Sequence, residues 1–332
     1  MRFDQARLDA LRAAVDTGTF EAAARELSVT PSAISQRIRS LETETGRVLL
    51  QRSKPVRPTA SGEVLLRLAR QVDALGRDAD AALGREGASG DDLGSGDGDA
   101  APARLEPLPL AVNADSLATW LLPALPQLAG GISFALQRAD ESRTTEVQRE
   151  GAVMAAITTV PAPVQGCSSV ALGAMRYRPM ASPEFIERWL SGTGARRDGR
   201  AASGVGGRGQ RGAGGAGAGR GGAEDLARAP VVVFDRSDEL QHRYLASRGV
   251  EVSSPPCHFV PSSADFVDAI RRGFGWGMVP ELQLRDDDTL IALDPSHHLD
   301  VLLHWQQWQL HTDALARTAA AVLSAASRTL RH

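Results

Sequence analysis

The stretch from Phe20 to Leu41 reads FEAAARELSVTPSAISQRIRSL, and it predicts two short amphipathic helices around a tight turn. Apolar residues recur at helical spacing: Phe20, Ala23, Ala24 and Leu27, then Ile34, Ile38 and Leu41. Ser28 and Val29 form the expected turn. Thr30 is a suitable N-cap, and Pro31 fits the first position of a helix because its missing N–H would be unpaired there. The second helix should therefore begin sharply.

Small, polar and basic side chains lie opposite the apolar stripe of the second helix. At about 100° per residue this face comprises Ser32, Gln36, Arg39 and Thr43, flanked by Ser35 and Arg37. Such side chains suit base edges and phosphates in a major groove, so the helix is predicted to be the recognition element of a helix-turn-helix. An ordinary pair of helices with a solvated basic face is the alternative.

The sequence after this stretch predicts a β-wing. Residues 48–51 and 56–57 read as two short strands, joined by a turn that carries Arg52 and Lys54. A first helix over residues 7–15 completes a domain at 1–58. The residues predicted to contact or position DNA are Thr30, Pro31, Ser32, Ser35, Gln36, Arg37, Arg39, Arg52 and Lys54.

Charge is concentrated on this domain. The whole chain of 332 residues has a net charge of only -3, which excludes a general polyanion binder, whereas residues 31–58 hold six basic and two acidic residues. Two distant cysteines, no signal-peptide pattern and no long apolar run fit a cytoplasmic protein without a membrane partner.

A long helix is expected over residues 59–84, capped by Thr59 or Ser61. Its apolar residues follow a heptad spacing: Leu65, Leu68, Val72, Leu75, Ala79 and Ala82. Such a seam needs a partner helix, most simply the same helix of a second subunit, and the alternative is packing on its own domain. Paired helix-turn-helix units also suit DNA half-sites.

Two tracts of low complexity interrupt the chain. Residues 85–106 are acidic and glycine-rich and should form a flexible hinge, and residues 191–223 resemble a disordered insertion rich in glycine and arginine. The other residues from 107 to 332 alternate short apolar strands with helices. That order predicts an α/β domain with mainly parallel sheets, in which ligands bind beyond the carboxyl ends of strands.

Residues 1–85 resemble the winged helix-turn-helix and linker helix of LysR-type transcriptional regulators, and the remainder resembles their effector-binding domain. Three segments resemble the ArgP or LysG subgroup, which regulates arginine and lysine export: AVNADSLATWLLPAL (111–125), RTTE (143–146) and PPCHFVPSSADFV (255–267). The acidic hinge and the insertion depart from the family pattern.

The resemblance implies a two-subdomain α/β effector domain like a periplasmic binding protein, with the ligand in the cleft. Subdomain I would comprise residues 107–168 and 294–332, and subdomain II residues 169–293. It also implies a homodimer through residues 59–84 or a tetramer, with operator DNA and RNA polymerase as partners and no cofactor.

The predicted effector site begins where residues 108–112 end. Asn113, Asp115 and Ser116 open a helix whose N–H groups and Ser116 hydroxyl could hold a carboxylate. By family position, five further residues would line the same cleft: Thr158 and Thr159, Asp235, and the adjacent Ser262 and Ser263. A ligand ammonium or guanidinium needs an acid, for which the candidates are Asp115, Asp140, Glu141 and Asp235. A solvated loop or a helix cap is the alternative for each acid.

We therefore expect a transcriptional activator that senses lysine or arginine and controls an exporter gene. The alternatives are a regulator of the same architecture with another small effector, a DNA-bending or replication-control protein, and an enzyme with a DNA-binding head. No nucleophile with a matching base stands out, and the histidines His297, His298, His304 and His311 lack tetrahedral spacing, so neither an enzyme nor a metal site is expected.

Overall fold

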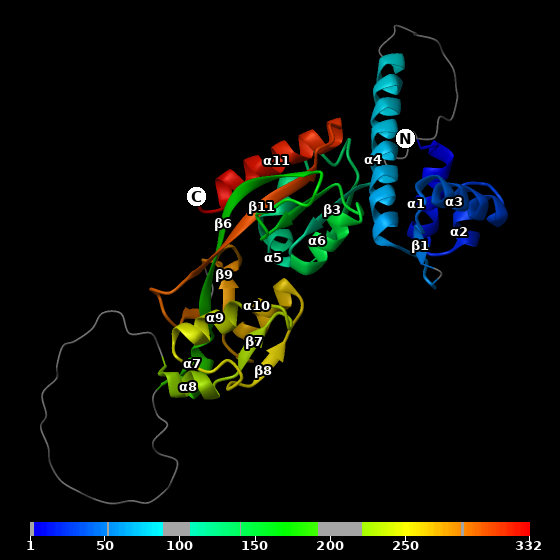
Figure 1. Ribbon diagram of the computed structural model, residues 1–332. Coiled ribbons are helices and arrows are strands. Elements are labelled where there is room, and N and C mark those ends of the chain that lie inside the picture. Colours follow the sequence, from blue (N-terminus) through cyan, green and yellow to red (C-terminus); the bar gives the residue numbers. More distant parts are fainter. Residues whose placement is uncertain (1–2, 52, 89–106, 140, 192–220, 287–288) are drawn as a thin grey trace, which may run out of the picture. The chain divides into compact units, whose positions relative to one another are not determined.

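The computed structural model describes residues 3–51, 53–88, 107–139, 141–191, 221–286 and 289–332 (Figure 1). The chain divides into two compact units. Unit 1 holds residues 1–113, 123–172 and 303–325, and unit 2 holds residues 114–122, 173–302 and 326–332. None of the helices in the described ranges is both long and apolar enough to cross a membrane.

Unit 1 begins with the three predicted helices, α1 (Gln5–Asp16), α2 (Phe20–Glu26) and α3 (Pro31–Thr45). Their apolar stripes meet in one core that includes Leu11, Ile34 and Leu41. The start of α3 is as predicted: the Thr30 hydroxyl accepts a hydrogen bond from the Ala33 N–H at 3.2 Å, and a proline stands in the first turn. The helix-turn-helix is thus confirmed.

The predicted wing consists of β1 (Leu50–Gln51) and β2 (Arg57–Pro58), which pair antiparallel. The long helix α4 (Ala60–Ala88) follows, capped by the Thr59 hydroxyl, which accepts from the Gly62 N–H at 3.1 Å. Helices α1, α2 and α3 and the wing together form the domain called the head below. In Figure 1 the three helices of the head lie beside α4. The predicted end of the helix at residue 84 is wrong, because α4 continues through Ala88. The rest of the predicted hinge, 89–106, lies outside the described residues.

The heptad seam predicted on α4 is divided between two environments. Leu65 is buried in the head's core and Leu68 packs against it. Further along the seam, Leu75 is 45% exposed. Two apolar side chains of α4 outside the predicted seam, Val64 and Leu83, are 54% and 66% exposed. The head therefore uses the first part of the seam itself, because its three helices alone leave that side of their core open to α4.

A four-stranded part of a sheet completes unit 1. Its strands lie in the order β11, β5, β3, β4, where β3 (Leu108–Val112) is parallel to both β4 (Phe134–Arg138) and β5 (Ala155–Thr158). Strand β11 (Leu299–Trp308) is antiparallel to β5. Helix α6 (Glu141–Arg149) packs on β3 and β5, and the last helix is α11 (Asp313–Thr329).

Unit 2 is built around β6 (Cys167–Ala181), which pairs antiparallel with β9 (Gly277–Pro280) and β10 (Ile291–Ala292). A parallel pair, β7 (Val231–Val233) and β8 (Cys257–Phe259), lies in the same unit. The first helical segments of this unit are α5 (Ala114–Ser116) and η1 (Leu117–Leu121), and η2 (Leu122–Ala124) follows them. The remaining helices are α7 (Pro183–Trp189), α8 (Ala223–Arg228), α9 (Leu240–Ser247), α10 (Ser263–Arg271) and η3 (Glu281–Gln283).

Three expectations need correction. The sheets are mixed and not mainly parallel, because β6 pairs antiparallel with β9 and β10, and β11 pairs antiparallel with β5. Residues 114–122, 294–302 and 326–332 belong to unit 2 and residues 169–172 to unit 1, so the boundaries between the units fall within β6, β11 and α11 as well as at residues 113 and 122. At the predicted insertion 191–223, residue 223 already begins α8, whereas residues 192–220 lie outside the described part.

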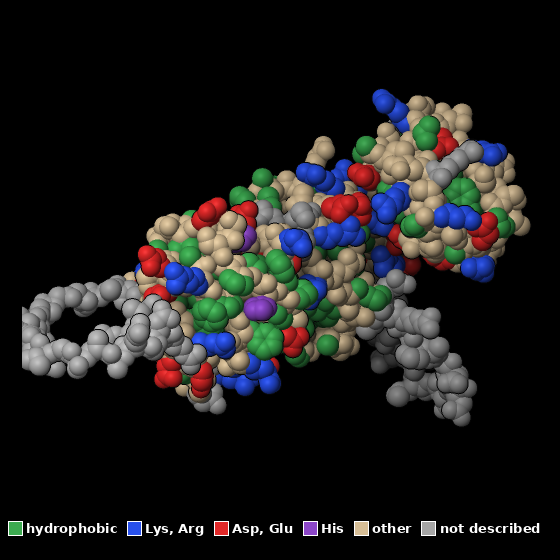
Figure 2. Space-filling model, turned by 90° about the horizontal axis from the view of Figure 1, so that it is seen from below, with side chains coloured by type: hydrophobic (Ala, Val, Ile, Leu, Met, Phe, Trp, Pro, Cys, Tyr) green, Lys and Arg blue, Asp and Glu red, His purple; other side chains and the backbone are tan. Residues whose placement is uncertain are grey.

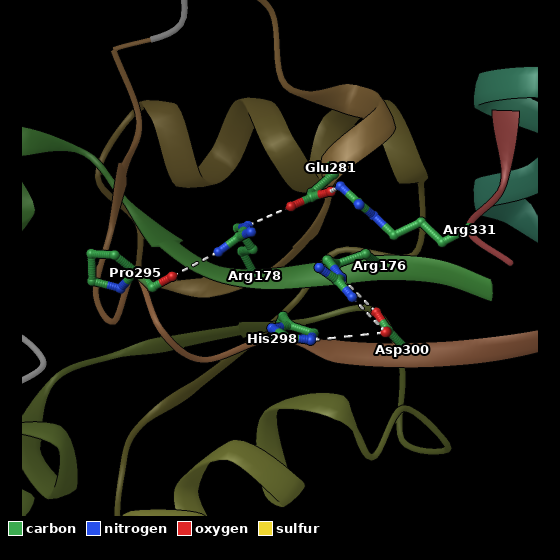
Figure 3. A network of polar contacts seen from close by, with 7 residues as sticks. All are labelled: Arg176, Arg178, Glu281, Pro295, His298, Asp300 and Arg331. Carbon is green, nitrogen blue, oxygen red and sulfur yellow. Dashed lines mark hydrogen bonds and ion pairs between the residues drawn. The ribbon is translucent and has the colours of Figure 1, made fainter. Parts of the chain in front are cut away.

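A network of charges in unit 2 ties the C-terminal tail to the strands (Figure 3). Glu281 accepts hydrogen bonds from Arg178 and from Arg331, the latter at 2.6 Å, and Arg176 forms a two-pronged ion pair with Asp300 at 2.7 and 2.8 Å. A cavity of about 220 Å³ opens beside Arg176, Glu281 and Arg331. None of the predicted effector residues lines it.

Candidate DNA-reading head and effector site

The face of α3 predicted to meet DNA is open to solvent. Ser32, Gln36, Arg39 and Thr43 are exposed, and Ser35 and Arg37 are half-buried. The Thr30 and Ser32 hydroxyls share a hydrogen bond of 2.9 Å, and the Thr43 hydroxyl bonds back to the Arg39 carbonyl. These local bonds fix the small side chains and leave the side chains of Gln36 and Arg39 accessible.

The arginines of the head fall into two classes. Those on α1 are paired with acids of the head, Arg7 with Glu44 at 3.0 Å and Arg12 with Glu26 at 3.2 Å. Within the described residues, Arg37 and Arg39 on α3 form no ion pair. A guanidinium without a protein partner is available for phosphate or for a guanine edge.

The other predicted DNA contacts are partly described. Pro31 and Lys54 are exposed, at the start of α3 and in the wing, and Arg52 lies outside the described residues. Figure 2 shows acidic and basic side chains mixed over one face of the molecule, in keeping with the small net charge of -3. The free arginines of α3 are therefore distinguished by their lack of acidic partners and not by a large basic field.

Asp115 is the centre of the candidate effector site in unit 2. Its Oδ2 accepts a hydrogen bond from the Tyr177 hydroxyl at 2.7 Å, and its Oδ1 accepts one from the Ser263 hydroxyl at 2.5 Å. Gln283 Nε2 in turn donates to the Ser263 oxygen. Side chains of β6 and α10 thus meet at the Asp115 carboxylate, which follows β3 in the chain. A side chain of η3 supports the Ser263 donor.

Asp115 and its neighbour Asp238 have no positive partner among the residues that the structure describes. No Lys, Arg or His in the described ranges forms an ion pair with either carboxylate. The Asp238 oxygens accept from the N–H groups of Phe234 and Leu240, both at 3.1 Å. Burial, and to a smaller extent the charge of Asp115, raises the pKa of Asp238. The site therefore holds two acids within electrostatic reach of one another, and no cation of the described residues forms an ion pair with them.

Further predicted residues surround this centre in unit 2. Ser116 is fully buried and its hydroxyl has no hydrogen-bond partner in the described structure. Ser262 precedes α10 without a capping bond from its side chain, and Asp235 accepts from the Ser237 N–H and hydroxyl at 2.8 and 2.6 Å. Ser116 and Ser262 thus keep free polar atoms, whereas one oxygen of Asp235 already serves its own loop.

The other predicted residues belong to unit 1 or fall outside the description. Thr158 is buried and accepts from the Val160 N–H at 3.2 Å, Thr159 follows it, and the Asn113 side-chain oxygen is buried without a partner in the described ranges. Asp140 lies outside the described residues, as does the side chain of Glu141. The structure thus brings together Asp115 and Ser263 directly.

Comparison with known proteins gives the family. Residues 6–63 match the family model described as bacterial regulatory helix-turn-helix protein, lysR family. The HTH-type transcriptional regulator LysG of Mycobacterium tuberculosis is 38% identical over 98% of this chain and 94% of its own. The chain belongs to the LysR family. The lysine export transcriptional regulatory protein LysG of Corynebacterium glutamicum is 35% identical over 98% of each chain.

Solved structures of LysR-family regulators show the same fold. The crystal structure of ArgP from Mycobacterium tuberculosis has a TM-score of 0.79 at 36% identity and covers 99% of both chains. Full-length LysG from Corynebacterium glutamicum with bound effector Arg has a TM-score of 0.72 at 33% identity and covers 99% of this chain and 100% of its own. These relatives are transcriptional regulators, so the expectation that this LysR-family chain is not an enzyme is confirmed.

Three residues of the candidate site escaped the sequence analysis. Tyr177, Gln283 and Asp238 come from β6, η3 and the loop before α9, far from Asp115 in sequence. Tyr177 offered a weak signal, because it is one of only two tyrosines in this LysR-family chain and a buried tyrosine normally needs a partner for its hydroxyl. Which partner it finds depends on the tertiary fold.

Proposed function

We propose that this LysR-family regulator senses lysine or arginine through Asp115 and controls transcription of an amino-acid exporter gene. The observation that carries the proposal is the Asp115 carboxylate, held by two neutral hydroxyls at 2.7 and 2.5 Å with no cationic partner among the described residues. An ionised carboxylate has about four lone-pair positions, so about two remain for a ligand. Asp115 is half-buried, so leaving its charge uncompensated is unfavourable, and an ammonium or guanidinium would offset that cost.

The ligand's own carboxylate also needs donors. Ser116 has a buried hydroxyl without a partner in the described structure, and Ser262 has a hydroxyl free of capping. We propose these two residues for the carboxylate, with Asp235 and Ser263 beside them. For Asn113, Thr158 and Thr159 in unit 1, a role in effector binding stays a prediction. The arginine in the Corynebacterium LysG structure supports the choice of ligand class.

A screen of the full-length protein against the twenty amino acids tests this function. A ligand at about 100 times its Kd adds about 2.7 kcal/mol to the free energy of unfolding, so lysine or arginine should raise the thermal midpoint clearly. If the thermal midpoint rises only with a different small molecule, the protein is a regulator with another effector. No rise with a basic amino acid at millimolar concentration would contradict the proposed ligand class.

DNA is the second proposed partner, read by α3 as part of a homodimer. We assign the major groove to Ser32, Ser35, Gln36, Arg37 and Arg39, and the start of the helix to Thr30 and Pro31. Arg52 and Lys54 of the wing are proposed to contact the backbone or minor groove. The DNA-bound regulator would act on RNA polymerase, and it would do so in the cytoplasm. Sequencing of the chromosomal fragments bound by the protein should find a site upstream of an exporter gene, and its absence there would exclude that target.

The dimer is proposed to form through α4, with pairing of dimers into tetramers as a further step. The exposed apolar side chains Val64, Leu75 and Leu83 support this proposal. They recur on a helix of which Leu65 and Leu68 pack in the core of the head, so a second copy of α4 is the simplest partner for the exposed side chains.

A further inference from the structure

Both oxygens of Asp115 are held by hydroxyl groups, and only one of these comes from a rigid aromatic side chain. Tyr177 is 4% exposed on β6, where it pairs in register with Pro280 of β9. The strand fixes the ring, and its hydroxyl must be the donor, because an ionised carboxylate only accepts. The Ser263 hydroxyl holds the other oxygen, and Gln283 Nε2 donates to Ser263, so that the Ser263 proton is directed to Asp115.

We propose that Tyr177 is the positioning residue that orients the Asp115 carboxylate, and thereby makes the effector site select cationic over neutral ligands. This inference rests on the proposed function of Asp115 as the acid that receives the ligand's cation. Tyr177 itself need not touch the ligand, since it acts through the oxygen that it binds.

The charges around Tyr177 support a protonated donor. Burial raises the pKa of Tyr177 far above its usual range, and the charges of Asp115 and Asp238 raise it further. The tyrosine hydroxyl therefore keeps its proton and donates a hydrogen bond to Oδ2 of Asp115.

Removal of the Tyr177 hydroxyl should affect the orientation of Asp115 more than the volume of the site. In Tyr177→Phe, the Oδ2 oxygen would lose its donor, and the Ser263 hydroxyl alone would hold the carboxylate. The carboxylate could then turn away from the direction in which it meets a ligand cation. A misoriented carboxylate no longer attracts a guanidinium much more strongly than a neutral group of the same shape.

Isothermal titration of the full-length protein with L-arginine and L-citrulline tests the inference. Citrulline has the same skeleton with an uncharged ureido group. We expect Tyr177→Phe to lower the ratio of arginine to citrulline affinity by about tenfold. Loss of packing alone would weaken both ligands equally and leave the ratio in place.

The chain offers a matched control in its other tyrosine. Tyr244 is also fully buried in unit 2, but its hydroxyl has no hydrogen-bond partner in the described structure. Tyr244→Phe should leave the affinity ratio unchanged. If Tyr177→Phe fails to fold, Ser263→Ala removes the other hydroxyl and should also lower the ratio.

The possible results separate the two proposals. If the unmodified protein binds arginine but Tyr177→Phe and Ser263→Ala keep its ratio of arginine to citrulline affinity, the role of Tyr177 is wrong and the proposed function stands. If the unmodified protein does not bind arginine at any pH, the proposed function itself fails.

Discussion

Arg39 lies exposed on α3 without an acidic partner among the described residues, unlike the arginines of α1. If it contacts a base or a phosphate, Arg39→Ala should weaken operator binding by about 1 to 3 kcal/mol, and loss of a phosphate contact would reduce the salt slope by about 1. Electrophoretic or fluorescence titration at several salt concentrations measures both quantities. Arg228→Ala on α8, an exposed arginine of unit 2, serves as the control.

An equal loss of affinity in Arg39→Ala and Arg228→Ala would point to a general charge effect. Unchanged binding in Arg39→Ala across the salt series would contradict the assignment of α3 to the DNA.

Glu281 gives a residue-scale prediction about pH. Burial alone would raise its pKa, but hydrogen bonds from Arg331 and Arg178 outweigh burial and lower the pKa below the ordinary value of 4.5. A carboxyl with a depressed folded-state pKa contributes stability above its unfolded pKa, and this contribution is lost as the pH falls through the folded pKa. Chemical denaturation between about pH 6 and pH 3 should therefore show acid destabilisation that Glu281→Gln reduces.

The exposed Glu187 on α7 is the control for Glu281, because it forms no ion pair within the described residues. Glu187→Gln should retain the acid destabilisation of the unmodified protein. A Glu281→Gln variant with an unchanged pH profile would show that the Arg331 and Arg178 contacts contribute nothing to stability.

Helix α4 contains two glycines in contrasting surroundings. A Cβ on Gly62 would lie 2.0 Å from the Leu49 carbonyl oxygen, whereas a Cβ on Gly76 would meet nothing within 4 Å. Gly62→Ala should therefore destabilise the head strongly, since the backbone of the wing must move. Gly76→Ala should stabilise the protein by about 0.5 to 1 kcal/mol, because alanine favours a helix. Urea denaturation compares the two, and equal effects would contradict the close approach of α4 to Leu49.

Local signals explain which elements were predictable. Thr30, Pro31 and the apolar spacing set the start and the buried face of α3 within a few residues of one another, and the structure confirms them. Strand direction was not predictable in this way, because the pairing of β6 with β9 and β10 depends on residues far away in sequence. Helix α8 was missed because its residues lie at the edge of a glycine-rich tract.

The candidate site shows the same limit. Asp115 and Ser263 could be proposed from their positions after a strand and at a helix start, but the hydrogen bond between them spans 148 residues. Tyr177 lies in the middle of a strand, where nothing local indicates that its hydroxyl meets a carboxylate. Tertiary contacts, and not local pattern, decide which polar residues share a site.

At the scale of the whole molecule, the exposed apolar side chains of α4 lead to a prediction about assembly. Leu75 is 45% exposed on this helix. A charge in a helix-helix seam is strongly unfavourable, so Leu75→Glu should shift the protein towards monomers in sedimentation velocity. Leu302→Glu, which changes an exposed leucine of β11, is the control. A Leu75→Glu protein that sediments like the unmodified one would exclude this face of α4 as the dimer contact.

Regulation is proposed to depend on the binding of a cationic effector by the Asp115 carboxylate. The most direct measurement is isothermal titration of L-arginine into the full-length protein and into its Asp115→Asn variant, which preserves shape and removes charge. Loss of one partner of a buried charge pair costs about 2 kcal/mol or more, so the variant should bind arginine at least about tenfold more weakly. Equal Kd values for the two proteins would contradict the claim that Asp115 receives the effector.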